Sequence, residues 1–374
     1  MSAYTVFRNT LVVLATIALC YLLVVTLDVW LVLLIGILVA SAVRPYVNWL
    51  RARRVPEAAA VLGTFLVLAL IAVILLLLVL PPVVNQVANY LQNDNLLANR
   101  LIVAQGWVER FLSDTAGNAV EIGIPADDVR AAVSELVDTV RLTAPELIDD
   151  IGGFVGNLIL VLVIGIYWAT SRERSEGFII SLLPLGRQAQ AQEIFREIET
   201  SLGAYVRGVV LISLIVGVAT FIALTLFRVP NAVSMSFIYG IATAIPIVGG
   251  FVGVVFAVGL ALLNSPQSAL VVFVVTLLIQ QVAVYWLSPR LLSRGADFNE
   301  LLVIVFIACG FALEGVGGAL LAIPVAGTLA ILLRRLVLEP RQAKVAPQRV
   351  EGGVLLHEKQ QNEPSVEVLT NPKA

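Results

Sequence analysis

Long, continuous apolar runs constrain the fold of this chain more than any other feature. A transmembrane helix needs about 20 apolar residues, and hydrocarbon admits only helices and closed barrels, because every backbone polar group needs an internal partner. The runs lack the alternation of polar and apolar residues that marks a barrel strand, so we expect helices. Six runs are candidate spans: Thr10–Leu27, Trp30–Val43, Ala58–Leu80, Ile151–Thr170, Ala204–Phe227 and Ala269–Leu287.

Two further apolar regions, Ala232–Leu263 and Leu301–Leu336, are too long for one helix and are interrupted by Gly and Pro. Hydrophobic residues make up 59% of the chain and charged residues 13%, against about half and a quarter in soluble domains. Lipid must therefore surround much of the surface. We predict an all-α, polytopic integral membrane protein with about eight membrane segments, including one or two broken or re-entrant helical hairpins.

Arginines gather in four of the polar segments between the runs. Short loops rich in Arg stay in the cytoplasm, and all four clusters agree if both termini are cytoplasmic. We therefore predict a multi-pass protein of the cytoplasmic (inner) membrane. The clusters are Arg44, Arg51, Arg53 and Arg54; Arg172, Arg174, Arg187 and Arg196; Arg290 and Arg294; and Arg334, Arg335 and Arg341.

These segments divide the chain into four parts. Residues 1–80 hold three membrane helices, and residues 81–150 form an external, amphipathic, acidic segment with eleven acidic and four basic residues. That segment is either a solvated cap or an electrostatic funnel for cations. Residues 151–338 form the transport core with a cytoplasmic linker at 171–204, and residues 339–374 form a disordered cytoplasmic tail.

One short motif, Ala-Ile-Pro with a Gly three residues after the Pro, occurs once in each interrupted region, at Ala244–Gly249 and Ala322–Gly327. Pro removes a helical hydrogen-bond donor, and Gly permits a bend or a close approach. Paired interruptions of this kind point to the binding site of a transporter. We expect one hairpin with its tip at residues 246–250 and a second that turns after Phe311. The alternative is a pair of Pro-kinked helices with Gly packing faces.

Polar residues near these interruptions are candidates for the substrate pathway. The amides of Gln280 and Gln281 lie within an apolar run and need partners, which are either a neighbouring helix or a substrate. Glu314 is a functional acid if its region lies in the membrane and a surface turn residue if it does not. The candidates from the motif and its surroundings are Pro246, Gly249, Gly250, Gln280, Gln281, Glu314 and Pro324.

A series of motifs, in this order and spacing, resembles the AI-2E family of permeases, which are similar to autoinducer-2 exporters. The resemblance covers about residues 5–338 of the chain. Its motifs are Arg44-Pro45, the turn at residues 50–56, Tyr167-Trp168, Leu183-Pro184, Tyr205-Val206-Arg207-Gly208, residues 245–249, Ser288-Pro289-Arg290 and residues 318–324.

The resemblance implies a secondary transporter with eight or so membrane segments. Family members are linked to export of autoinducer-2, and some relatives to sodium–proton or lithium–proton antiport. This chain departs from the family at two positions: Val209 replaces a frequent Gln, and Thr243 replaces a frequent acid. Thr243 therefore joins the candidate pathway residues, and the solute need not be the family's.

The sequence favours an exporter of a small polar solute, with a sodium–proton antiporter and a passive channel or scaffold as alternatives. The only histidine is His357, and no Walker A, H-E-x-x-H or G-x-S-x-G pattern occurs, so we expect no enzyme, catalytic residue, cofactor or metal. The expected partners are membrane lipid, a small polar solute and a coupling proton or sodium ion. A net charge of −2 suggests no nucleic acid, and small-residue faces such as Gly152–Gly156 permit a homo-oligomer.

Overall fold

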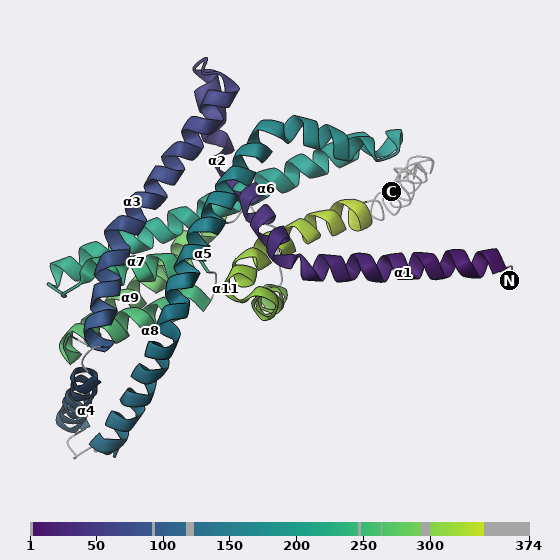
Figure 1. The fold of residues 1–374 in the computed structure, drawn as a ribbon. Coiled ribbons are helices and arrows are strands. Elements are labelled where there is room, and N and C mark those ends of the chain that lie inside the picture. The colour runs from purple at the N-terminus through teal and green to yellow at the C-terminus, as the bar shows by residue number, and fades with distance from the viewer. Residues whose placement is uncertain are drawn as a thin grey trace, which may run out of the picture.

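The computed structural model describes residues 3–91, 94–116, 123–245, 248–262, 264–292 and 300–339. Every regular element in these ranges is a helix, which confirms the predicted all-α class (Figure 1). The elements are α1 (Ala3–Val25), α2 (Leu27–Ala52), α3 (Glu57–Leu91), α4 (Asp94–Ala116), α5 (Ala126–Ser181), α6 (Leu185–Leu226), α7 (Ala232–Ala242), α8 (Val248–Leu262), α9 (Pro266–Val282), the π-helix η1 (Ala283–Leu287), α10 (Ser288–Leu292), α11 (Glu300–Leu333) and the π-helix η2 (Arg334–Leu338).

Six helices in the described ranges are long and apolar enough to cross a membrane, which confirms a polytopic membrane protein. Their outward side chains are large and apolar, as expected of a lipid-facing surface. Three shorter apolar helices, Asn9–Leu19, Ala232–Ala242 and Val248–Leu262, accompany them. The six are Leu27–Ala52, Glu57–Leu78, Val155–Ser181, Leu185–Leu226, Pro266–Leu291 and Leu301–Leu338.

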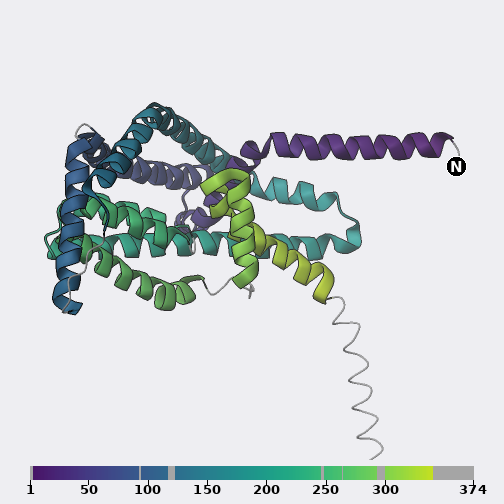
Figure 2. The same ribbon diagram turned by 90° about the horizontal axis from the view of Figure 1, so that it is seen from below.

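Helix α1 leaves the bundle sideways, and its N-terminal end lies far from the other helices (Figures 1 and 2). It packs against the start of α2. Its apolar side chains, including Tyr4, Phe7 and Leu14, are exposed along its length. Lipid is the surrounding that such a helix requires.

Helix α5 is one continuous helix of 56 residues. The expected boundary at residue 150, between an external segment and a membrane span, is therefore not a helix boundary. The N-terminal part of α5 packs against α4 through Ala98, Val133 and Val137. At its other end the chain turns at Leu182 and enters α6 after Pro184, whose ψ of 141° places it outside the helix.

Helices α2 and α6 pack closely where Pro45 interrupts the hydrogen bonding of α2. Pro45 has no N–H, so the carbonyl of Ser41 lacks its α-helical donor. The guanidinium of Arg207 on α6 donates to the carbonyl oxygens of Ser41, at 3.3 Å, and Ala42, at 3.1 Å. Gly203, one turn before Arg207, lets the helices approach, because a Cβ there would overlap the Ser41 carbonyl.

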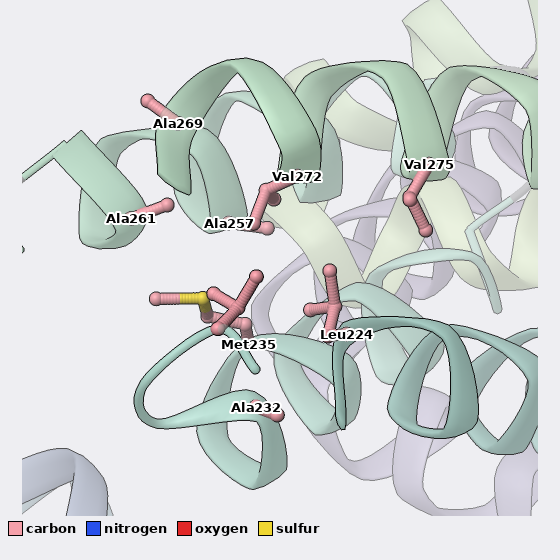
Figure 3. Packing of buried hydrophobic residues seen from close by; sticks show 9 residues of the cluster. Leu224, Ala232, Met235, Ala257, Ala261, Ala269, Val272 and Val275 are labelled. Carbon is pink, nitrogen blue, oxygen red and sulfur yellow. The ribbon is translucent and has the colours of Figure 1, made fainter. Parts of the chain in front are cut away.

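Helices α6 to α9 enclose an apolar core (Figure 3). Leu224 from α6, Met235 from α7, Ala257 from α8 and Val272 from α9 are fully buried and point toward one another in this core. Small residues on α8 and α9, including Ala261, bring the helices close together. Through this core the short helices α7 and α8 pack against the longer α6 and α9.

Helix α11 reverses direction at Glu314 and Gly315, so it is a helical hairpin. Gly315 has φ +56° and ψ −136°, a conformation open essentially to glycine alone. Gly310 and Gly318 lie in direct contact across the two arms, and Ile307 packs on Ala319. The second hairpin therefore turns after Phe311, as predicted from the sequence, and Pro324 of the second Ala-Ile-Pro motif lies inside its helical second arm.

Candidate functional site

A polar cluster joins α7 and α9 inside this apolar bundle. The hydroxyl of Tyr239 on α7 lies 2.8 Å from Oε1 of Gln280 and 3.0 Å from the carbonyl oxygen of Thr276, both on α9, and it can donate to either. Tyr239 and Thr276 are fully buried. Because a buried hydroxyl without a partner is costly in an apolar surrounding, this pairing fixes Tyr239 and Gln280 against each other.

Two glycines of α8 complete the cluster. A Cβ on Gly250 would overlap the side-chain amide of Gln280, and a Cβ on Gly249 would overlap the carbonyl of Ala242 at the end of α7. Gly250 therefore provides the space that the Gln280 amide occupies. Gly249 lets α8 begin directly against the end of α7.

The candidate residues from the sequence divide into two groups. Gln280 and Gly250 lie with Tyr239 in the polar cluster. Gly249 and Thr243 lie at the end of α7, where the Thr243 hydroxyl donates to the backbone carbonyl of Tyr239, one turn earlier, at 2.8 Å. Gln281 is exposed on another face of α9. Pro246 lies outside the described residues.

Glu314 and Pro324 belong to α11, which packs on α6 and α2, whereas α7, α8 and α9 pack on one another. Pro324 is buried in the second arm of the hairpin. Glu314 lies at the reversal of α11, and its carboxyl group interacts electrostatically with that of Asp28. Asp28 stands in the first turn of α2. The structure thus forms a second polar site from a carboxyl pair.

The π-helix η1 follows the polar cluster directly, at Ala283–Leu287. A π-turn adds a residue to the helical repeat, and such turns occur frequently at functional sites. Ala283 and Leu287 are buried against Ile212 and Val216 of α6. The wider turn therefore changes which side chains of the helix contact α6 in the residues directly after Gln280.

A buried ion-pair network connects α2, α5 and α6 at the end of the bundle that is rich in arginine. Glu199 on α6 accepts from Arg44 on α2 and from Nε of Arg172 on α5, the latter at 2.7 Å. Arg172 also pairs with Glu176 at 3.0 Å. Glu176 and Glu199 are about as buried as core residues, so each charge requires its partner.

A second ion-pair group ties the end of α11 to α6. Arg335 pairs with Glu197 at 2.8 Å and with Glu193 at 3.3 Å, and Arg334 also pairs with Glu197. These pairs are more exposed than the network around Glu199. They anchor the C-terminal arm of the α11 hairpin on α6.

Neither Tyr239 nor Asp28 is among the candidate residues predicted from the sequence. The signal for Tyr239 was its place three residues before the end of an interrupted apolar helix, where a buried hydroxyl needs a partner. The interaction of Asp28 with Glu314 depends on the reversal of α11, which brings together residues that lie far apart in the sequence.

Chemically, the cluster around Tyr239 offers an amide, two hydroxyls and backbone groups, and all of them are uncharged. Such groups can exchange hydrogen bonds with a polar solute but do not hold a metal or activate a nucleophile. Among the described residues no group of three or more His, Cys, Asp and Glu side chains is arranged to bind a metal ion.

Comparison with known proteins assigns a family. The sequence profile of the AI-2E family transporter matches residues 11–338. The chain is 26% identical over 300 residues to "Putative transport protein MT0215" of Mycobacterium tuberculosis, covering 78% of each chain. It is 25% identical over 311 residues to "Putative transport protein sll0060" of Synechocystis, covering 81% of this chain and 87% of the relative.

A shorter match has higher identity. The chain is 30% identical over 177 residues to "Putative transport protein YueF" of Bacillus subtilis, covering 46% of this chain and 48% of the relative. The matched segment thus spans about half the length of that relative. These relatives carry names for transport, and none of the names specifies a solute.

Proposed function

Because this chain belongs to the AI-2E transporter family, we propose that it is a secondary transporter that exports a small polar metabolite or signalling molecule, such as autoinducer-2, across the cytoplasmic membrane by alternating access. One observation carries the proposal: Tyr239 and Gln280 meet Gly250 where α7 and α8 are short, separate helices. Interrupted helices around polar groups are typical of solute sites in transporters.

The chemistry of the cluster supports an uncharged polar solute. The Gln280 amide and the Tyr239 hydroxyl bond to each other without a solute, and either can transfer its hydrogen bond to a solute hydroxyl or carbonyl. The α7–α8 and α11 hairpins supply two elements that can move relative to the longer α6 and α9. Movement of one hairpin would open the cluster to one side at a time.

The test uses two neighbouring glutamines. Purified protein in proteoliposomes is loaded with autoinducer-2 or with other small polar solutes, and the initial efflux rate is measured against concentration. We expect saturable efflux that falls about tenfold or more in Gln280→Leu, because a hydrogen-bonding group at the site is lost. Gln281→Leu, on the exposed face of α9, should keep the wild-type rate.

Three results would contradict the proposal. Efflux that rises linearly with concentration indicates a passive channel, and intact protein that moves none of the solutes indicates a scaffold. Equal rates in Gln280→Leu and Gln281→Leu would remove the cluster from the pathway. Thermal unfolding of both variants in detergent checks that each is folded before the rates are compared.

Sodium–proton antiport is a second candidate function, and the Asp28–Glu314 pair favours it. Two neighbouring carboxyl groups can share a proton or hold a cation, and an acid is functional by default where it lies at membrane depth. We expect Glu314→Gln and Asp28→Asn each to abolish sodium-driven proton movement, followed with a pH-sensitive dye in everted vesicles. Asp127→Asn, in an exposed ion pair with Arg130, is the control; unchanged antiport in Glu314→Gln would exclude the pair.

A further inference from the structure

A small polar cavity lies beside the ion-pair network, between α2, the start of α3, α5 and α6. Its volume is about 130 Å³, several times the roughly 10–15 Å³ that one buried water needs. Its polar lining comes from Arg44, Asn48, Arg51, Glu57, Trp168, Thr170, Arg172, Glu173 and Glu199. The cavity thus stands at the arginine-rich end of the bundle, away from the Tyr239–Gln280 cluster.

The cavity has hydrogen-bond donors without acceptors. The indole N–H of Trp168 is buried and finds no acceptor among the residues the structure describes. Arg44 uses Nη1 for its pair with Glu199, and a guanidinium carries five N–H donors. A buried donor without an acceptor is costly, so the lining favours an occupant that supplies acceptor oxygens.

Two of the three carboxylates in the lining, those of Glu199 and Glu57, are paired with arginines, and the third, Glu173, is exposed. Glu199 accepts from both Arg44 and Arg172, so its charge is compensated. Glu57 pairs with Arg51 at 3.3 Å, and both side chains are nearly half exposed; an exposed pair of this kind contributes little and is easily replaced. Arg51 is therefore free to turn toward an anion in the cavity, and its planar fork matches an oxyanion.

The position along the chain points to the lipid headgroups as the source of that anion. The cavity lies where α2 ends, α3 begins and the apolar part of α5 gives way to Thr170–Glu173. Close by, Arg53 stacks on Trp49 with 3.9 Å to the ring centroid. Paired Trp and Arg side chains are typical of the level of the headgroups, where an arginine between membrane helices can contact an anionic headgroup.

We propose that this cavity binds the phosphate group of an anionic membrane phospholipid. Arg51 and Arg44 contact the phosphate oxygens from α2, and the Trp168 N–H donates to one of them from α5. The lipid then joins α2 to α5 beside the Arg44–Glu199–Arg172 network. Nothing in this proposal depends on which solute is transported.

The experiment compares lipids on full-length protein in detergent. Binding of dioleoylphosphatidylglycerol is measured by native mass spectrometry, with dioleoylphosphatidylcholine as the reference lipid, and thermal unfolding is followed in parallel. We expect phosphatidylglycerol to bind more tightly and to raise the Tm of the wild type. Trp168→Phe, which removes the donor and keeps an aromatic ring, and Arg51→Gln should each weaken that binding about tenfold.

Arg53→Gln is the matched control, because Arg53 is a neighbouring arginine that does not line the cavity. It should bind phosphatidylglycerol as the wild type does. Arg51 is exposed, so Arg51→Gln tests the proposal even if Trp168→Phe fails to fold. Equal binding in Arg51→Gln, Arg53→Gln and the wild type would mean that the cavity holds water only, and would overturn the proposal.

Inorganic phosphate tests whether the cavity binds the phosphate group of a lipid or free phosphate. Added at millimolar concentration to protein in a zwitterionic detergent, it should leave the Tm unchanged, because inorganic phosphate lacks the acyl chains with which a lipid contacts the membrane helices. A rise in Tm with inorganic phosphate that Arg51→Gln removes, without any preference for phosphatidylglycerol, would overturn the assignment to a lipid.

Discussion

At the scale of single residues, Gly250 and Gln280 share one small space. A side chain at position 250 would occupy the volume of the Gln280 amide, and that amide is the partner of the buried Tyr239 hydroxyl. The absence of a Cβ on α8 is therefore a condition for the hydrogen bond between α7 and α9. A substitution of Gly250, Gln280 or Tyr239 should therefore alter the packing of the other two residues.

We predict that Gly250→Ala lowers the efflux rate in proteoliposomes about tenfold or more, because the new methyl group displaces the Gln280 amide from Tyr239. Overpacking of this kind costs about 1–3 kcal/mol, so the Tm should fall as well. The measurements are the initial efflux rate and thermal unfolding in the same detergent.

The control lies on the same helix. Gly259 has no atom within 4 Å of the position its Cβ would take, so Gly259→Ala should keep the wild-type efflux rate and Tm. If Gly250→Ala behaved in the same way as Gly259→Ala, the close contact between α8 and Gln280 would have no role in transport.

Sequence alone could not separate Gln280 from Gln281. Both are amides in one apolar run, and neighbouring residues on a helix point about 100° apart, so one of them had to face a different surrounding. Which one faces α7 depends on the packing of Tyr239 against Thr276. Thr243, Gly249 and Gly250 were predictable, since they flank the interruption that the motif marks.

At the scale of the elements, Glu199 connects three helices. Its carboxylate accepts from Arg44 on α2 and Arg172 on α5 while it stands on α6. A buried ion pair brings little net stability compared with an apolar contact, yet removing one partner leaves a charge uncompensated. The network therefore defines how α2, α5 and α6 are arranged more than it strengthens them.

We predict that Glu199→Gln lowers the free energy of unfolding by about 3 kcal/mol, at the low end for a broken buried pair, because Arg172 keeps Glu176 as a partner. Glu57→Gln breaks an exposed pair with Arg51 and should cost less than about 1 kcal/mol. Denaturant unfolding in detergent measures both, and equal costs would show that burial does not decide the effect.

Helix ends were less predictable than helices. The change from polar to apolar residues near position 150 looked like a boundary, but a change in polarity does not stop a helix, and α5 continues through it. In α11 the sequence offered both Pro324 and Gly315 as breaks. The chain reverses at Gly315, whose positive φ only glycine readily adopts, while Pro324 is accommodated within a helix.

At the scale of the whole molecule, the direction of the chain through the membrane is still a prediction. Arginine clusters place the turn between α5 and α6 in the cytoplasm and the start of α5 outside. We predict that a membrane-impermeant maleimide labels Ile124→Cys in intact cells and labels Leu185→Cys only after the cells are opened. Both native side chains are exposed, so the labels can reach them.

The labelling needs a background in which Cys20 and Cys309 are replaced by serine, and that background without an added cysteine is the control. Labelling of Leu185→Cys in intact cells would reverse the proposed orientation. Labelling of both positions in intact cells would place the two ends of α5 on one side and contradict a span within that helix.

The unbroken length of α5 has a mechanical consequence. At 1.5 Å per residue, its 56 residues extend about 84 Å, against about 30 Å for the hydrocarbon core of a bilayer. The helix is therefore much longer than the hydrocarbon core, and its apolar stretch, Val155–Ser181, lies toward its C-terminal end. A tilt of about 10° about its centre would swing each end by about 7 Å. A force on the part of α5 that packs against α4 would thus displace the arginine-rich end of the helix without any change in the helix itself.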